Sequence, residues 1–273
     1  MFKLVVTDLD GTFLNGNRLV SAENKKAIKQ LQAAGIKICF ASGRPFKGMD
    51  RFAKEVGLGK GESYFITNTG ARAYNYNSRQ LIYNKILNMS DYLQLAKYIK
   101  DDDVQIVAYG EDKLYSFSKN INDTLKYDQS ILKMEIEVID SKSFSNLNFG
   151  RMNIMGSKTA IDNAVSKIPV DFLSQYYTVR NEDFSFEFEN KMAGKGNALK
   201  ALAKYLNLDL DTEVLTFGDN FNDLEMLMAT GNSVSMGQSC DAIKSKTKYV
   251  ADTNCNDGFA KMVYKLVFNK GDN

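Results

Sequence analysis

The sequence predicts an α/β protein: a Rossmann-like core with a parallel sheet, interrupted by an inserted α+β domain that contains an antiparallel sheet. Three observations support this prediction. Near both ends of the chain, short apolar runs alternate with amphipathic helical patterns, as in βαβ units. Between about residues 82 and 188, alternating strands joined by short polar turns replace that rhythm. The length of 273 residues is enough for two ordinary domains.

The N-terminal segment has the pattern of strand, helix, strand. Residues 4–6 form an apolar run typical of a buried parallel strand, and residues 36–41 form a second one. Between them, Ser21 can cap a helix and Gly35 can end it. Right-handed crossover rules place two such strands in one parallel sheet. We expect the apolar face of the helix to consist of Ala27, Ile28, Leu31 and Ala34.

The βα rhythm returns after Lys195, where a second helix precedes an apolar strand at residues 214–217. The economical interpretation is one core made from both ends of the chain, residues 1–83 plus 190–273. The inserted domain then spans residues 84–189. The apolar face of the second helix is expected to comprise Ala198, Leu199, Leu202 and Leu206.

The inserted segment carries two hairpin signals and two helical stretches. Polar turns at residues 110–113 and 181–183 each lie between two strand-like runs, which is typical of β-hairpins. We expect strands at 104–109, 114–117, 176–179 and 184–188, and helices at 90–100 and 157–168.

Composition restricts the classes of function. Apolar residues make up 44% of the chain and charged residues 25%, which is typical of a soluble globular protein. The formal net charge is +2 and no block of Lys and Arg with interleaved aromatics occurs, so we expect no nucleic-acid partner. No apolar run approaches the ~20 residues of a membrane helix, and no signal peptide is evident. We therefore expect a cytoplasmic protein with no membrane partner.

The chain contains no histidine, which excludes Ser-His-Asp and Cys-His catalysis and removes the commonest zinc ligand. Acid–base chemistry must come from carboxylates, lysine, tyrosine or cysteine. The three cysteines, Cys39, Cys240 and Cys255, are far apart and odd in number, so they indicate neither a disulfide framework nor a paired metal site. We interpret all three as buried, reduced thiols.

Two acidic clusters follow apolar strands: DLDGT at residues 8–12 and GDNFND at residues 218–223. Taken singly, each is also compatible with an Asp-rich turn or a helix cap. Ligands of open α/β sheets bind at the carboxyl ends of the strands, and if these strands are neighbours the acids meet and require a cation. Oxygen ligands alone favour a hard ion, and Mg²⁺ suits a phosphate site better than Ca²⁺. The acids concerned are Asp8, Asp10, Asp219 and Asp223.

Two further segments are suited to binding an anion. The sequence ASGR at residues 41–44, followed by Pro45, ends the second strand and presents a hydroxyl and backbone N–H groups. Lys195 is flanked by glycines and opens a helix, which makes it a candidate phosphate contact. In isolation, an ordinary Ser-Gly turn and a solvated lysine explain these residues equally well. Their combination with the acidic clusters decides between these interpretations, because the acids, the hydroxyl and the lysine occur in an order that one mechanism needs.

Together these motifs resemble those of the haloacid dehalogenase-like (HAD) phosphatases, and most closely the Cof-type sugar phosphatases. That branch carries DxDGT, S/T-G-R, K-G-x-A-L and GDNxND, which read here as DLDGT from Asp8, SGR from Ser42, KGNAL from Lys195 and GDNFND from Gly218. The resemblance covers essentially the whole chain and implies a HAD core with a cap inserted between the second and third motifs. Weaker similarities are NTGA at residues 68–71 and DG at residues 257–258, and Gly194 stands where the branch usually has serine.

The resemblance implies a Mg²⁺-dependent phosphoric monoester hydrolase that acts on a small phosphorylated metabolite, such as a sugar phosphate, through an aspartyl-phosphate on Asp8. Asp10 would be the general acid and base. We expect a monomer or a weak homodimer. The implied phosphate-binding residues are Ser42, Gly43, Lys195 and Asn222. The implied Mg²⁺ ligands are Asp8, the backbone carbonyl of Asp10, Asp219 and, mainly through water, Asp223. Thr12 and Arg44 are expected on the substrate side.

Two other functions use the same core. A phosphotransferase or phosphomutase would pass the phosphoryl group to a sugar hydroxyl instead of water, although a Cof-like cap favours hydrolysis. A non-catalytic phosphometabolite sensor predicts the loss of at least one catalytic position, and every such position is intact. The motifs do not identify the substrate or the cap residues that select it.

Overall fold

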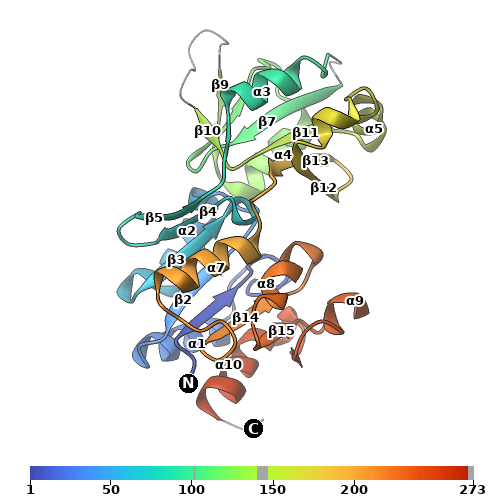
Figure 1. Cartoon of the computed structure of the whole chain (residues 1–273). Helices are drawn as coiled ribbons and strands as arrows, with labels where there is room; N and C mark the ends of the chain where they lie inside the picture. Colours follow the sequence, from blue (N-terminus) through green and yellow to red (C-terminus); the bar gives the residue numbers. More distant parts are fainter. Residues whose placement is uncertain (101–102, 140–146, 270–273) are drawn as a thin grey trace. The chain divides into compact units, whose positions relative to one another are not determined.

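The computed structural model describes residues 1–100, 103–139 and 147–269, and the chain divides into two compact units (Figure 1). Unit 1 comprises Met1–Gly43, Met49–Asn84 and Gly194–Asn273. Unit 2 comprises Arg44–Gly48 and Lys85–Ala193. The insertion expected at residues 84–189 corresponds to the longer segment of unit 2, which also takes in the short piece that follows the SGR motif.

Unit 1 is built on a mainly parallel sheet. Within the described residues it has eight strands in the order β16-β15-β14-β1-β2-β3-β4-β5. The strands from β16 to β3 run parallel, and β4 and β5 add an antiparallel edge that the sequence did not suggest. The strands are β1 (Leu4–Thr7), β2 (Lys37–Ala41), β3 (Ser63–Thr67), β4 (Arg72–Asn75), β5 (Leu81–Asn84), β14 (Val214–Gly218), β15 (Ser233–Ser235) and β16 (Tyr249–Val250).

The sheet of unit 1 is buried on both faces. Its central strands are therefore apolar throughout rather than alternating between apolar and polar residues. On one face, Leu199 and Leu202 of α7 belong to the same core cluster as Leu4 of β1. On the other face, the ring of Phe13 lies 5.1 Å from those of Phe40 and Phe259. The helices of unit 1 are α1 (Ala22–Ala33), α2 (Phe46–Val56, whose first turn belongs to unit 2), η1 (Leu58–Lys60), η2 (Asn68–Gly70), α7 (Lys195–Tyr205), η3 (Phe221–Asp223), α8 (Leu224–Met228), α9 (Asp241–Lys244), η4 (Asn254–Asn256) and α10 (Gly258–Phe268).

The expected signals of the first helix are confirmed with one correction. Ser21 is the N-cap of α1, and its hydroxyl accepts a hydrogen bond from the Asn24 N–H at 3.1 Å. Gly35 follows the helix with a φ of +72°, in the left-handed region that favours glycine. Ala34, expected on the buried face, is exposed because the helix ends at Ala33.

Unit 2 contains a second sheet with helices against both faces. Within the described residues its order is β12-β13-β11-β7-β8-β9, and all pairs are antiparallel except β8 with β9. Helices α3, α5 and α6 pack on one face and α4 packs on the other. The elements are β6 (Leu87–Asn88), α3 (Met89–Ala96), β7 (Val104–Tyr109), β8 (Lys113–Ser116), α4 (Asp123–Leu132), β9 (Glu135–Val138), β10 (Asn148–Phe149), β11 (Arg151–Gly156), α5 (Lys158–Ser166), α6 (Val170–Leu173), β12 (Tyr176–Glu182) and β13 (Ser185–Asn190).

Both hairpins expected in the insertion are confirmed, because β7 pairs with β8 and β12 pairs with β13. Strand β12 continues to Glu182, so the second turn is shorter than expected. The central strand β11 was not predicted.

The cysteine interpretation is right for one residue and wrong for two. Cys39 is buried within β2, whereas Cys240 and Cys255 are exposed. Cys240 directly precedes α9, in the segment between β15 and β16, and Cys255 lies in η4, after β16. A membrane-spanning helix, one both long and apolar enough, is not found in the part of the chain that the structure describes.

Candidate active site

The carboxyl ends of three neighbouring strands bring the predicted motifs to one edge of the sheet of unit 1. Strand β1 lies between β14 and β2, and its Thr7 is in register with Phe217 and Phe40. Asp8 directly follows β1, and Asp219 directly follows β14. The condition for the two acidic clusters to meet, that their strands are neighbours, is therefore fulfilled.

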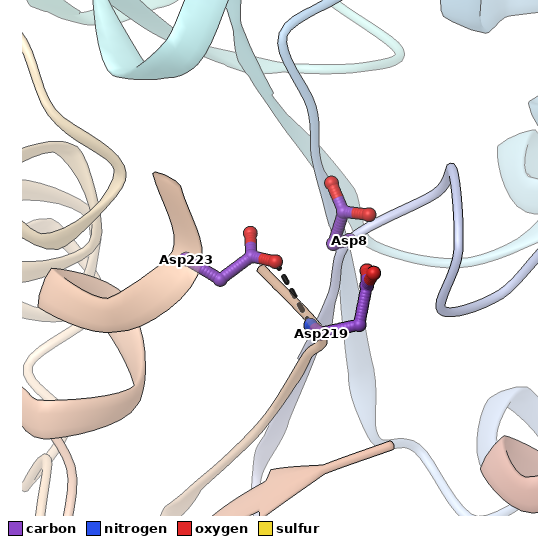
Figure 2. A group of neighbouring side chains, drawn as sticks. All are labelled: Asp8, Asp219 and Asp223. Carbon is purple, nitrogen blue, oxygen red and sulfur yellow. Dashed lines mark hydrogen bonds between the residues drawn. The ribbon is translucent and has the colours of Figure 1, made fainter. Parts of the chain in front are cut away.

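Three carboxylates gather at this edge (Figure 2). Asp8, Asp219 and Asp223 each offer an oxygen, and these oxygens all lie within 4.8 Å of one another. The second oxygen of Asp223 accepts hydrogen bonds from the backbone N–H groups of Asp219 at 3.0 Å and Asn220 at 3.2 Å. These two bonds fix the conformation of the loop after β14 and so help to hold Asp219 in the cluster.

Lys195 holds two of the three acids from within the protein. Its Nζ donates to Asp8 Oδ1 at 2.6 Å and to Asp223 Oδ1 at 2.5 Å, and its side chain has no exposed surface. The alternative interpretation of Lys195 as a solvated lysine is wrong. Burial lowers the pKa of Lys195, but the negative charges of Asp223 and Asp8 outweigh it and raise the pKa above its ordinary value. The lysine is therefore a fixed positive charge.

The three acids outnumber the single ammonium group of Lys195, and the pKa values of Asp8 and Asp219 are raised. The pKa of Asp8 lies well above its ordinary value because burial, together with the charges of Asp223 and Asp219, outweighs the effect of Lys195. Burial and the charge of Asp223 raise the pKa of Asp219 to about 6. Such raised values indicate uncompensated negative charge in a site of low polarity.

The turn after Asp8 is built to receive Asp219. The hydroxyl of Thr12 donates to Asp219 Oδ1 at 2.8 Å. Gly11 has a φ of +83°, and a Cβ atom there would lie 2.5 Å from Asp219 Oδ2, so only glycine fits. Thr12, expected on the substrate side, is fully buried, and its hydroxyl orients an acid of the cluster.

Asp10 stands apart from the gathered carboxylates, although the sequence placed all four acids together. Its carboxylate is about two-fifths exposed, and its Oδ1 lies 3.8 Å from Nε of Arg18. It is still close enough to raise the pKa of Asp219. Asp10 is the third residue after β1, in the turn that follows Asp8, and it is not among the three acids whose oxygens gather at the strand ends.

The remaining predicted residues are divided between the two units. Unit 1 contains Ser42, Gly43 and Asn222, and unit 2 contains Arg44. Ser42 is buried directly after β2, where its N–H donates to the Ile66 carbonyl at 2.9 Å, and Gly43 follows it in unit 1. Arg44 is buried within unit 2, and its Nη1 donates to the Ile131 carbonyl at 3.3 Å. Asn222 is half-buried in η3, immediately before Asp223.

The unusual glycine before the motif lysine has a structural reason. Gly194 has a φ of +147°, a conformation that residues with a side chain rarely adopt. A Cβ atom at this position would also lie 2.5 Å from Oε2 of Glu225. Glycine therefore lets the chain enter α7 so that Lys195 points inward.

Sequence reasoning missed three amide side chains that hold the turn after Asp8. Asn24 Nδ2 donates to the Phe13 carbonyl and Asn254 Nδ2 donates to the Leu14 carbonyl, each at 2.8 Å. Gln238 Nε2 donates to the Gly11 carbonyl. These residues are scattered over the chain without a shared motif, so no spacing could have indicated them.

Comparisons with known proteins agree with this geometry. The sequence profile of a family described as haloacid dehalogenase-like hydrolase matches residues 5–263. The chain belongs to the haloacid dehalogenase-like hydrolases. Among solved structures, a haloacid dehalogenase-like hydrolase from Bacteroides thetaiotaomicron superposes with a TM-score of 0.90 at 23% identity, covering 97% of this chain and 100% of that one. This similarity confirms the predicted fold class.

Curated relatives of this HAD-like hydrolase are named as phosphatases. Phosphatase YwpJ of Bacillus subtilis is 26% identical, with 97% of this chain and 100% of YwpJ covered. The 5-amino-6-(5-phospho-D-ribitylamino)uracil phosphatase YcsE of the same organism is 27% identical, with 96% of this chain and 94% of YcsE covered. Together with the family match, they establish the present HAD-like hydrolase as a phosphatase.

Proposed function

We propose that this phosphatase depends on Mg²⁺ and acts on small phosphorylated metabolites, such as sugar phosphates, through an aspartyl-phosphate on Asp8. The observation that carries the proposal is the surroundings of Asp8. Its carboxylate follows the central strand β1, contacts the buried ammonium of Lys195 at 2.6 Å and shares a cluster with Asp219 and Asp223. A nucleophile beside a fixed positive charge and a group of metal-binding oxygens is what phosphoryl transfer requires.

The donor set fits Mg²⁺. Within the described residues, the cluster offers carboxylate oxygens of Asp8, Asp219 and Asp223, and the excess of negative charge calls for a divalent cation. Asp8 and Asp219 would bind the ion directly, together with the backbone carbonyl of Asp10. Both oxygens of Asp223 accept protein hydrogen bonds, so we assign it an indirect role through water. When bound, the ion supplies positive charge that reduces the repulsion between the phosphoryl oxygens and Asp8.

Different residues of the protein would carry out the successive steps of the reaction. Asp8 would attack phosphorus in line, while the bond from phosphorus to the leaving oxygen breaks. Asp10 would give its proton to the leaving alkoxide and then take a proton from the water that hydrolyses the aspartyl-phosphate. Unit 2 is assigned the selection of the leaving group, with Arg44 as one contact. The phosphoryl oxygens would be held by Ser42, Gly43, Lys195 and Asn222.

A phosphate-release screen tests this function. Sugar phosphates, nucleotides and cofactor phosphates are incubated with the protein in Mg²⁺ or in EDTA, and the name of YcsE adds 5-amino-6-(5-phospho-D-ribitylamino)uracil to the panel. We expect free phosphate from at least one sugar or polyol phosphate in Mg²⁺ and none above background in EDTA. Phosphate release that EDTA leaves unchanged would contradict the proposed metal dependence.

Product analysis with a sugar bisphosphate separates the competing functions. Free phosphate indicates hydrolysis, whereas an isomerised bisphosphate indicates a phosphomutase. Binding without either product indicates a sensor. We also propose that the protein acts in the cytoplasm, as a monomer or weak homodimer, without nucleic-acid or membrane partners.

Mg²⁺ is expected to raise the melting temperature more at about pH 7.5 than at about pH 5. Protons compete with the ion at the lower pH, because the pKa of Asp8 is raised and that of Asp219 is about 6. In the metal-free protein, a raised carboxyl pKa adds stability below the ordinary value of ~3.9, and this stability is lost as the pH rises through about 6. Thermal melts with and without Mg²⁺ at both pH values measure the effect. Equal shifts would argue against an ion at these acids.

Replacing Thr12 with Val should weaken Mg²⁺ activation. The hydroxyl of Thr12 lowers the pKa of Asp219 and fixes its orientation, so its loss raises that pKa further and loosens the ligand. Loss of a residue that supports a metal ligand costs about 10- to 100-fold in metal affinity. The Mg²⁺ concentration for half-maximal phosphate release measures it, with the exposed Thr212→Val as the matched control. An unchanged Mg²⁺ requirement in Thr12→Val would contradict the proposed role of Thr12 in supporting Asp219.

A further inference from the structure

The turn of unit 1 that carries Asp10 is closed by its own backbone. The Thr12 N–H donates to the Leu9 carbonyl at 3.3 Å, so Asp10 and Gly11 are the two central residues of a β-turn. The φ of +83° at Gly11 is typical of the third position of a type II turn. The contact of Asp10 with Arg18 is 3.8 Å long and partly exposed to solvent, so this ion pair contributes little to the position of the acid. That position depends on the backbone of the turn.

One exposed side chain from the C-terminal part of unit 1 is attached to this turn. Gln238 Nε2 donates to the carbonyl of Gly11, the residue that follows Asp10. Gln238 Oε1 accepts a hydrogen bond from the Asn254 N–H at 3.2 Å, so both polar atoms of the amide are engaged. The side chain of Gln238 therefore connects the turn to η4, which begins at Asn254.

The loop that carries Gln238 is itself attached to the core of unit 1. It directly follows β15, and the Met236 N–H donates to the Gly218 carbonyl at 3.2 Å. The Gly237 N–H donates to the Asp252 carbonyl, also at 3.2 Å. A Cβ atom at Gly237 would lie 3.0 Å from the carbonyl carbon of Asp252, so the two segments are in close contact. Gln238 thus extends toward the turn from a well-supported backbone.

The bond from Gln238 affects geometry more than stability. An exposed glutamine gains little stability from such a bond, because water offers the same bond and ordering the side chain costs conformational entropy. In contrast, a small displacement of a catalytic group can lower the rate strongly. We infer that Gln238 is a positioning residue for Asp10, which keeps the acid where its proton reaches the leaving oxygen as the bond from phosphorus to that oxygen breaks. This inference rests on the proposed function, in which Asp10 is the general acid.

The choice of leaving group distinguishes positioning of the acid from a general effect on the fold. An alkoxide needs a proton as it leaves, whereas p-nitrophenolate is a stable anion that leaves without one. The ratio of kcat/KM for glucose 6-phosphate or glycerol 3-phosphate, whichever is faster, to kcat/KM for p-nitrophenyl phosphate is measured in Mg²⁺. Gln238→Met keeps the length of the side chain but removes the amide. Its ratio should fall about 10-fold, because a displaced acid loses part of a contribution of roughly 10²- to 10⁴-fold.

A second glutamine offers a matched control. Gln32 Nε2 also donates to a backbone carbonyl, that of Gly57 at 2.9 Å, but it lies near the end of α1. Gln32→Met should therefore keep the wild-type ratio. Gln238→Ala removes the whole side chain and should show the same fall as Gln238→Met. Both Gln238 variants should keep the melting temperature close to that of the wild type, because the residue is exposed.

Asp10→Asn separates failure of the inference from failure of the proposed function. Its ratio should fall at least about 100-fold, and adding Gln238→Met should lower it no further, because the acid that Gln238 positions is gone. A wild-type ratio in Asp10→Asn, or no turnover of any of these esters by the wild-type protein, would contradict the proposed function and the inference with it. A ratio that falls in Asp10→Asn but not in the two Gln238 variants would overturn the inference alone, as would a further fall in the double variant.

Discussion

Asp8→Asn is expected to abolish phosphate release, a loss of at least about 10⁴-fold, while the protein remains folded. The amide nitrogen and oxygen of asparagine cannot supply the ionised oxygen that attacks phosphorus. Folding should survive because the pKa of Asp8 is raised, which means that its ionised form is disfavoured in the native state. Lys195 also keeps its second partner, Asp223, at 2.5 Å.

Two measurements check this expectation. Steady-state phosphate release with p-nitrophenyl phosphate gives the rate, and acid-quenched mass spectrometry detects the phosphoryl group on the wild-type protein and its absence from the variant. Asp241→Asn, an exposed acid in the first turn of α9, is the matched control and should behave as wild type. Wild-type turnover by a folded Asp8→Asn protein would assign the nucleophile elsewhere.

Local patterns predicted the fold well where one signal dominated. The apolar runs of β1, β2 and β14 and the caps of α1 follow from rules that act over a few residues. The central strand β11, with the sequence RMNIMG, was missed although its first four residues alternate between polar and apolar side chains. Both faces of this strand are covered, so Asn153 is buried at a position where the alternation predicts exposure to solvent.

The meeting of three of the four expected acids was predictable from the sequence, but the geometry around them was not. The acids at residues 8, 219 and 223 were expected to meet, and they do because β1 and β14 are adjacent, a fact of topology that no local pattern contains. The partial exposure of Asp10 and the burial of Thr12 depend on the turn at Gly11. Such details arise from contacts between distant segments, which composition and spacing do not record.

Lys195→Met is the prediction that separates catalysis from stability. The rate of phosphate release should fall about 10²- to 10³-fold, because a fixed positive charge beside the phosphoryl oxygens is lost. Stability should also fall, because Asp8 and Asp223 remain buried without the ammonium that lies 2.6 Å and 2.5 Å from them. Removal of one partner from a buried ion pair costs about 3–5 kcal/mol, and a second acid loses its partner here.

The pH dependence of that stability loss identifies its cause. Without Lys195 the pKa of Asp8 should rise further, so the added stability is present below the ordinary value of ~3.9 and is lost as the pH rises through the raised pKa. Urea unfolding of metal-free protein should therefore show a small difference from wild type at about pH 5 and a larger one at about pH 8. The exposed Lys200→Met in the same helix should show neither effect. A difference that is equal at both pH values would mean that lost packing, rather than the unpaired acids, destabilises the variant.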